Sequence, residues 1–282
     1  MGERRVLRLN GVELCLQDFG EPGDPAILLI AGAASSMDWW DTAFCKLLAD
    51  GGRRVVRYDL RDTGESVTYP PGEPDYTIDD LVLDVAALVE ALQLAPVHLA
   101  GISMGGGLAQ QFAIRYPGAL ATLTLLSTSP GEGPDLPGME ARLATYFSTS
   151  MVPPDWSDEA AVIQNVLDFE RALSGSIPVD QNRVRTIEHG VVERSTSLAS
   201  AENHWQVAGG AGGESRERLA EISVPTLVIH GTEDPLLPIA HGEALAREIP
   251  GARLLRITGM GHQNPPPQTW DVIVPAILEH TA

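Results

Sequence analysis

The chain has 282 residues, of which 44% are hydrophobic and 20% charged, a composition typical of folded globular proteins. Its formal net charge of −19 argues against a nucleic-acid partner, because phosphate binding requires clustered Lys and Arg side chains. No apolar run approaches the roughly 20 residues that span a bilayer, so we expect no membrane association. The two cysteines, Cys15 and Cys45, form no disulfide framework, and we expect a cytoplasmic protein with reduced thiols.

The first predicted element is a β-hairpin. Val6–Leu9 and Val12–Phe19 flank Asn10-Gly11, two residues that tolerate positive φ in a tight turn. The strands predicted after the hairpin are mostly short, nearly continuous apolar runs, which are typical of parallel strands buried on both faces. They are Ile27–Ile30, Val55–Tyr58, Val97–Ala100, Leu120–Leu126, Thr226–Ile229 and Arg253–Ile257.

Helical patterns lie between these strands. Thr77–Leu92 has apolar residues at helical spacing, with Thr77 as its N-cap. The other predicted helices are Thr42–Asp50, Gly105–Arg115 and Gly242–Ile249. Strands that alternate with helices predict an α/β fold with a mostly parallel central sheet flanked by helices.

Residues from about 130 to 222 show helical patterns but no convincing strand. The predicted helices are Met139–Ser148, Ser157–Leu173 and Asn182–Leu198, and Gly131–Gly138 and Gly209–Gly213 are loops. We therefore expect a core made of residues 1–130 and 223–282, and a helical cap at 131–222, called the insertion below. A lid over a site is the favoured role of the insertion, and a plain helical elaboration is the alternative.

The strongest motif is Gly101-Ile102-Ser103-Met104-Gly105, a G-x-S-x-G sequence between a predicted strand and a predicted helix. A sharp strand-to-helix turn holds the serine in a strained conformation, and Gly101 and Gly105 avoid a collision there. The turn also presents the Met104 N–H as an oxyanion donor. A phosphate-binding loop is the competing interpretation, but no Lys follows the glycines and G-x-G-x-x-G is absent.

A seryl nucleophile needs a base and an acid that orients the base. His262 follows the strand Arg253–Ile257, and Asp234 follows the strand Thr226–Ile229. Parallel strands joined by one crossover bring these two loops to the same sheet edge. Glu233 is the alternative acid. His204, beside Trp205 in the insertion, is a weaker candidate for a side chain that faces a ligand.

The loop after Ile27–Ile30 should supply a second oxyanion donor, for which we choose the Ala33 N–H. Five aromatic residues of the insertion either line an apolar pocket or form the core of the insertion, and the core is favoured for any single one. These are Tyr146, Phe147, Trp156, Phe169 and Trp205.

Several segments resemble single-chain α/β-hydrolases with a helical cap over residues from about 10 to 280. They are VVRYDLRDTGES (55–66), LAGISMGG (99–106), VPTLVIHGTEDP (224–235) and ITGMGH (257–262). The segments RYDLRDTGES (57–66), GISMGG (101–106) and IPGARLLRITGMGH (249–262) look especially like the aclacinomycin methylesterase group, whose members remove a methyl ester from an anthracycline polyketide. The chain departs from many members at Ala31-Gly32, where they carry His-Gly, and at Arg61-Asp62, where they carry Arg-Gly.

The resemblance implies Ser103 as nucleophile, His262 as base and Asp234 as acid, with Ala33 and Met104 N–H groups as oxyanion donors. We expect a serine hydrolase that cleaves a small apolar carboxylic ester through an acyl-enzyme, without metal or organic cofactor. A methyl ester of a bulky apolar or polyketide-like substrate is the particular ester that the resemblance suggests. The family also includes lactonases, C–C bond hydrolases, perhydrolases and slow-turnover ligand sensors, which remain alternatives. A haloalkane dehalogenase would need an Asp at the position of Ser103. The sequence does not fix the oligomeric state.

Overall fold

The computed structural model describes residues 2–208 and 216–282, and the predicted loop Gly209–Gly213 lies outside this part of the chain. An eight-stranded sheet runs through the described residues in the order β1-β2-β4-β3-β5-β6-β7-β8. Only the pairs β1–β2 and β2–β4 are antiparallel, and the other neighbours are parallel. The strands are β1 (Arg5–Leu9), β2 (Val12–Phe19), β3 (Ala26–Ile30), β4 (Arg54–Tyr58), β5 (Val97–Ile102), β6 (Leu120–Leu126), β7 (Thr226–Gly231) and β8 (Arg253–Ile257).

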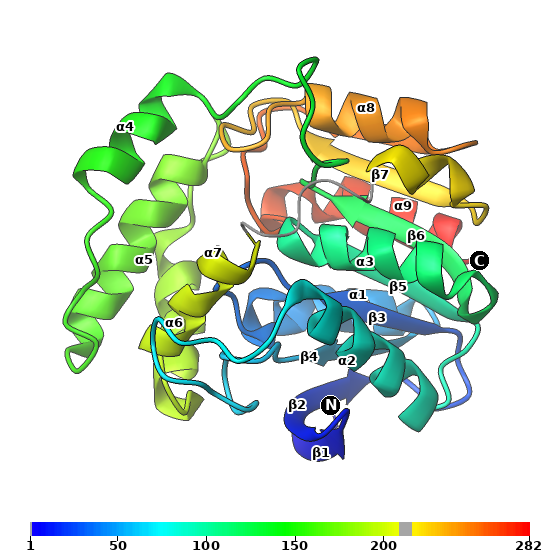
Figure 1. Cartoon of the computed structure of the whole chain (residues 1–282), viewed down its shortest axis with the longest axis horizontal. Helices are drawn as coiled ribbons and strands as arrows, with labels where there is room; N and C mark the ends of the chain where they lie inside the picture. The colour runs from blue at the N-terminus through cyan, green and yellow to red at the C-terminus, as the bar shows by residue number, and fades with distance from the viewer. Residues whose placement is uncertain (1, 209–215) are drawn as a thin grey trace.

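Helices cover both faces of this sheet (Figure 1). The α-helices are α1 (Thr42–Asp50), α2 (Ile78–Ala91), α3 (Met104–Arg115), α4 (Ala141–Thr149), α5 (Glu159–Leu173), α6 (Gln181–Arg194), α7 (Asn203–Ala208), α8 (Ala240–Glu248) and α9 (Trp270–His280). The 3₁₀ helices are η1 (Met37–Trp39), η2 (Pro117–Ala119), η3 (Ala199–Glu202), η4 (Arg216–Glu221) and η5 (Pro267–Thr269). None of the helices in the described residues is both long and apolar enough to cross a bilayer.

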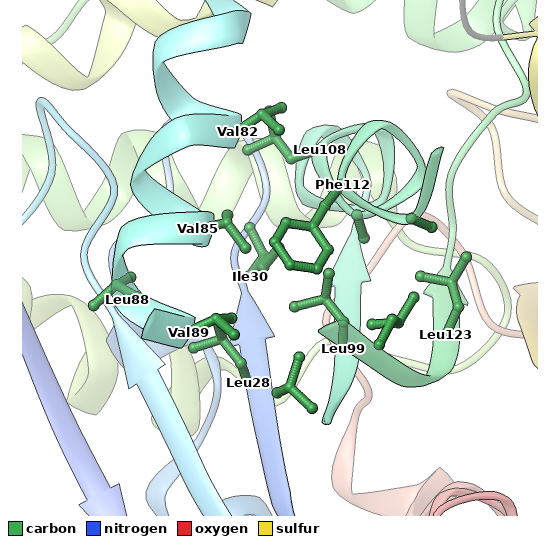
Figure 2. Close-up of a cluster of buried hydrophobic side chains, with 14 of the residues drawn as sticks. Leu28, Ile30, Val82, Val85, Leu88, Val89, Leu99, Leu108, Phe112 and Leu123 are labelled. Carbon is green, nitrogen blue, oxygen red and sulfur yellow. The ribbon is translucent and has the colours of Figure 1, made fainter. Parts of the chain in front are cut away.

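Alternate side chains of the central strands enter two different cores. On β3, Leu28 and Ile30 join the cluster that packs under α2, α3 and α8, whereas Ile27 and Leu29 join the cluster under α1 and α9. Figure 2 shows the first cluster, in which Phe112 of α3 lies among side chains of α2 and of the strands. Burial on both faces explains why the parallel strands read as continuous apolar runs.

The local signals act as expected. Asn10 and Gly11 adopt φ of 49° and 80°, which closes the β1–β2 hairpin. Thr77 caps α2 through a capping box, in which its side chain accepts from the Asp80 N–H and the Asp80 carboxylate accepts from the Thr77 N–H. The predicted α/β architecture with a mostly parallel sheet is confirmed.

Between β6 and β7 the described residues form helices and no strand, and α4, α5 and α6 stand apart from the sheet on one side (Figure 1). The predicted helix Asn182–Leu198 is wrong at its end, because α6 stops at Arg194. Beyond it, the Thr196 N–H donates to the Gly64 carbonyl and draws the chain onto the core. Neither α7 nor α9 was predicted from the sequence.

Candidate active site

The turn between β5 and α3 holds Ser103 in the strained conformation that the motif predicts. Ser103 has φ of 52° and ψ of −120°, which is unfavourable for a residue with a Cβ. Its N–H donates to the Leu126 carbonyl at 3.0 Å, and the Thr128 hydroxyl donates to its carbonyl at 2.8 Å. The loop after β6 therefore keeps the turn in place.

Close backbone contacts explain the two glycines of the motif. A Cβ at Gly101 would lie 2.2 Å from the Gly105 carbonyl oxygen, and a Cβ at Gly105 would lie 2.4 Å from the Ala31 carbonyl oxygen. Both distances are far below van der Waals contact. Side chains at these positions would thus push α3 away from β3 and β5.

The structure brings the three predicted side chains into one hydrogen-bonded row. His262 Nε2 lies 3.0 Å from Ser103 Oγ, and His262 Nδ1 lies 2.8 Å from Asp234 Oδ2. The three residues follow β5, β7 and β8, so they meet at the carboxyl edge of the sheet. The His262 loop is also held by the insertion, because the Leu173 carbonyl at the end of α5 accepts from the His262 N–H at 2.9 Å.

The Asp234 carboxylate is fully buried and fully engaged. Its Oδ1 accepts from the N–H groups of Leu236 and Leu237 at 3.0 and 2.8 Å. Burial alone raises the pKa of Asp234, but His262 and a hydrogen bond from His230 together hold that pKa well below its usual range. An ionised Asp234 favours the His262 tautomer that carries its proton on Nδ1 and leaves Nε2 free to accept the Ser103 proton.

The alternative acid points elsewhere. The Glu233 carboxylate accepts from the Ser176 N–H at 2.6 Å and from the Ser176 hydroxyl at 3.0 Å. Glu233 thus ties the insertion to the loop after β7, and the carboxylate beside His262 belongs to Asp234.

The loop after β3 lies against the serine. A Cβ at Gly32 would come within 3.5 Å of Ser103 Cβ, and Ala33 lines a small cavity together with Ser103 and His262. The Ala34 N–H donates to His204 Nδ1 at 2.9 Å. His204 is fully buried, so the idea that it faces a ligand is wrong.

A larger cavity adjoins this small one and encloses about 920 Å³, including space open to solvent. Both cavities share Ala33, Ser35, Phe169, Glu170 and Trp205 as wall residues. Four of the five aromatic residues of the insertion, all except Phe147, line the larger one, and for these four a place in the core of the insertion is wrong. Phe147 packs against Tyr146 and Phe169 instead.

Two carboxyl groups of this cavity were not singled out from the sequence. Burial raises the pKa of Glu170 to about 7, and burial together with the nearby Glu170 raises that of Glu188 to the same value. The Trp39 N–H donates to Glu188 at 3.0 Å. Both glutamates lie on helices that read as ordinary amphipathic patterns, so no local signal marks them.

Among residues 2–208 and 216–282, no three His, Cys, Asp or Glu side chains are arranged to hold a metal ion. Cys15 and Cys45 are both buried thiols, and burial raises the pKa of each to about 12.

A serine on a sharp strand-to-helix turn, with a histidine and a carboxylate at the same carboxyl edge of a mostly parallel sheet, is the arrangement typical of α/β-fold hydrolases. The family model of the α/β-hydrolase fold matches residues 25–264, and this chain belongs to that family. The fold and the family expected from the sequence are thereby confirmed.

Within that family, the chain is similar to rhodomycin D methylesterase DauP of Streptomyces sp. (strain C5), with 29% identity that covers 98% of this chain and 97% of the relative. It is 26% identical to 3-oxoadipate enol-lactonase 2 of Acinetobacter baylyi, over 97% of this chain and 96% of that protein. A hydrolase from Pseudomonas aeruginosa PA01 superposes with a TM-score of 0.74 at 26% identity, covering 99% and 98% of the two chains.

Proposed function

We propose that the chain is a carboxylic ester hydrolase in which Ser103 is the nucleophile, His262 the general base and Asp234 the acid that orients the base. The observation that carries this proposal is the hydrogen-bonded row from Ser103 Oγ through the imidazole to Asp234. The similarity to a methylesterase over nearly the whole chain supports an ester as the substrate.

In the first half of the reaction, Ser103 Oγ attacks the ester carbonyl carbon while its proton passes to His262 Nε2. The carbonyl oxygen gains negative charge, and the N–H groups of Ala33 and Met104 are the proposed donors that stabilise it. Collapse of this intermediate breaks the bond to the alcohol oxygen, which leaves with the proton from His262. The products of this half are the alcohol and an acyl group on Ser103.

In the second half, water attacks the acyl carbon as His262 takes one of its protons. The tetrahedral intermediate collapses, the bond to Ser103 Oγ breaks, and His262 returns the proton to that oxygen. The carboxylic acid departs and the serine is restored. Every proton in this scheme moves through His262 Nε2, which lies 3.0 Å from Ser103 Oγ.

The larger cavity indicates the substrate class. Aromatic walls from Trp39, Tyr146, Trp156, Phe169 and Trp205 favour a bulky, flat, apolar body, such as a polyketide-like ring system that carries a methyl ester. Among the described residues, the same walls include Asp62, Glu170, Glu188 and Glu202 but no Lys, Arg or His. We therefore expect neutral or cationic esters to be accepted and esters with a second carboxylate to be rejected.

In this proposal residues 131–222 form the cap, and residues 1–130 and 223–282 form the hydrolase core. The cap supplies most of the aromatic walls of the larger cavity, and the core supplies the reacting groups. The three reacting side chains would then belong to the core, and most of the side chains that select the substrate would belong to the cap.

The direct test measures turnover of p-nitrophenyl esters and labelling by a fluorophosphonate, in the native protein and in Ser103→Ala. We expect repeated turnover and one label per native chain, and neither in the variant. A single slow burst would indicate a ligand sensor, and labelling that survives in Ser103→Ala would refute the assigned nucleophile.

A lactone is the second candidate substrate, because a lactone is a cyclic ester and the enol-lactonase relative covers nearly the whole chain. The same three residues would open the ring, and the alcohol would stay attached to the acid. A panel of matched methyl esters and lactones with aromatic bodies, compared by kcat/KM, decides between the two. A vinylogous 1,5-diketone is added to the panel as a third compound, and its cleavage would instead identify a C–C bond hydrolase.

A further inference from the structure

The imidazole of His204 connects two core loops from the inside of the molecule. His204 is the second residue of the short helix α7, and its side chain is fully buried. Its Nδ1 accepts from the Ala34 N–H at 2.9 Å, and its Nε2 lies 2.7 Å from the Arg61 carbonyl oxygen. The first loop follows β3 and the second follows β4, so one residue near the end of the insertion fixes both.

Only one form of the ring satisfies both contacts. A carbonyl oxygen cannot donate, so Nε2 carries the proton toward Arg61 and Nδ1 is the acceptor for Ala34. Burial lowers the pKa of His204, which keeps the ring neutral. The Arg61 anchor is itself fixed, because its guanidinium donates two hydrogen bonds to Asp84 at 2.7 and 2.8 Å.

The peptide group between Ala33 and Ala34 is held at both of its ends. His204 Nδ1 accepts from the Ala34 N–H, and the Ser35 hydroxyl donates to the Ala33 carbonyl oxygen at 3.2 Å. Ala34 also adopts φ of 55°, a conformation that costs on the order of 1 kcal/mol or more for a residue with a Cβ. Such a conformation persists only where neighbouring contacts enforce it.

We infer that His204 is a positioning residue, which holds the loop after β3 so that the Ala33 N–H faces the carbonyl oxygen of a substrate bound at Ser103. The inference rests on the proposed function, in which Ala33 is an oxyanion donor. The Ala33 N–H is joined to this fixed peptide group through a single Cα. Its direction therefore depends only on the φ and ψ angles of Ala33. The insertion thereby contributes to the reaction itself as well as to the substrate cavity.

The test compares His204→Phe, which fills the space without hydrogen bonds, with His204→Gln, whose amide supplies one acceptor and one donor. Kinetics on a p-nitrophenyl ester should show kcat reduced on the order of 10²-fold in His204→Phe with KM changed less than about threefold, because a misplaced donor acts on the transition state. His204→Gln should recover part of this loss.

An aryl boronic acid provides the second readout. Boron takes Ser103 Oγ as its fourth ligand while the hydroxyl proton passes to His262, and the negatively charged adduct resembles the intermediate of ester hydrolysis. The inhibition constant of the boronic acid should rise in His204→Phe in proportion to the loss of kcat/KM. An unchanged inhibition constant would overturn the inference.

Asn203→Ala is the matched control. Asn203 is the buried neighbour of His204 on α7, and it donates to Asp62 at 3.0 Å and accepts from the Gly72 N–H at 2.6 Å. Its hydrogen bonds within the described residues go to the segment from Asp62 to Gly72 and not to the loop after β3, so the control should lower the melting temperature while kcat stays within about twofold. Equal losses of kcat in Asn203→Ala and His204→Phe would show that α7 acts only through stability and would overturn the inference.

Ser35→Ala keeps the test decisive if His204→Phe does not fold. It frees the same peptide group from its carbonyl end, and kcat should fall while KM stays nearly constant. Unchanged kcat in both Ser35→Ala and His204→Gln would overturn the inference. The proposed function fails separately, if the native protein shows neither turnover nor labelling at Ser103.

Discussion

Arg194 at the end of α6 donates to both carboxylate oxygens of Asp59, at 2.6 and 2.8 Å, in a pair that is almost completely buried. Asp59 follows β4 and also accepts from the Met37 N–H at 2.9 Å. A second carboxylate, that of Asp38, accepts from Arg194 Nε at 2.6 Å. Helix α6, which forms one wall of the larger cavity, is therefore fixed to the loop after β4 by a charged contact rather than by apolar packing alone.

Arg194→Ala should destabilise the protein by about 3–5 kcal/mol, because it leaves Asp59 buried without its counter-charge. Arg194→Lys should restore little of this, since an ammonium cannot replace the two parallel hydrogen bonds. Urea denaturation measures both effects. The control is Arg171→Ala, which breaks an exposed pair with Asp168 and should cost about 0.5 kcal/mol or less. Similar losses in the two alanine variants would contradict the claim.

Asp234→Asn should lower kcat on the order of 10⁴-fold, because an amide at this position favours the wrong imidazole tautomer. The control variant is Glu233→Gln at the adjacent residue, whose side chain contacts Ser176 rather than His262. It should leave kcat nearly unchanged. Steady-state kinetics on one ester decides the matter, and the reverse pattern would exchange the roles of the two acids.

Gly105→Ala should destabilise the protein by about 1–3 kcal/mol or more and abolish turnover, because the added methyl group would overlap the Ala31 carbonyl. Gly107→Ala, two residues further along α3, is the control. A Cβ at Gly107 meets nothing within 4 Å, so this variant should gain roughly 0.5–1 kcal/mol from the lower entropy of its unfolded chain. Thermal unfolding with a parallel activity assay would expose a failure of either expectation.

Glu188→Gln should become more stable than the native protein as the pH rises. Burial and the nearby Glu170 raise the pKa of Glu188 from 4.5 to about 7, so the folded state holds a proton that the unfolded state has released. This group therefore lowers native stability as the pH rises from about 4.5 to about 7. The variant should match the native protein near pH 4.5 and exceed it by up to about 3 kcal/mol at pH 8. A difference that does not change with pH would contradict the shifted pKa.

The sequence predicts most of the sheet because both faces of its parallel strands are covered and the apolar runs are unbroken. It does not predict α9, where Pro275 lies in the helix and removes one backbone donor. The apolar side chains of Ile273 and Ile277 compensate by packing into the core under β7. Burial in the tertiary structure thus overrides a local signal against a helix.

The proposed catalytic residues were identifiable because each one lies in a short motif directly after a strand. The contacts of His204 and Arg194 could not be identified from the sequence, because their partners lie more than 130 positions away in the chain. The departure from Arg-Gly at Arg61-Asp62 also becomes clear in the structure. Asp62 adopts φ of 67°, and its carboxylate accepts from the Tyr76 hydroxyl at 2.7 Å. Those contacts stabilise a conformation that glycine adopts without strain.

The hydrogen bond between the Leu173 carbonyl and the His262 N–H bears on protein engineering. A chimera that keeps this sheet and replaces residues 131–222 with the corresponding segment of another family member would change the support of the His262 loop along with the walls of the larger cavity. Grafts that preserve the backbone path around residue 173 should retain turnover on simple esters while acquiring new selectivity. We expect grafts that alter this path to be inactive even though all the proposed reacting side chains are present. A screen for selectivity alone would discard such grafts without showing that the lost hydrogen bond to the His262 N–H is the cause.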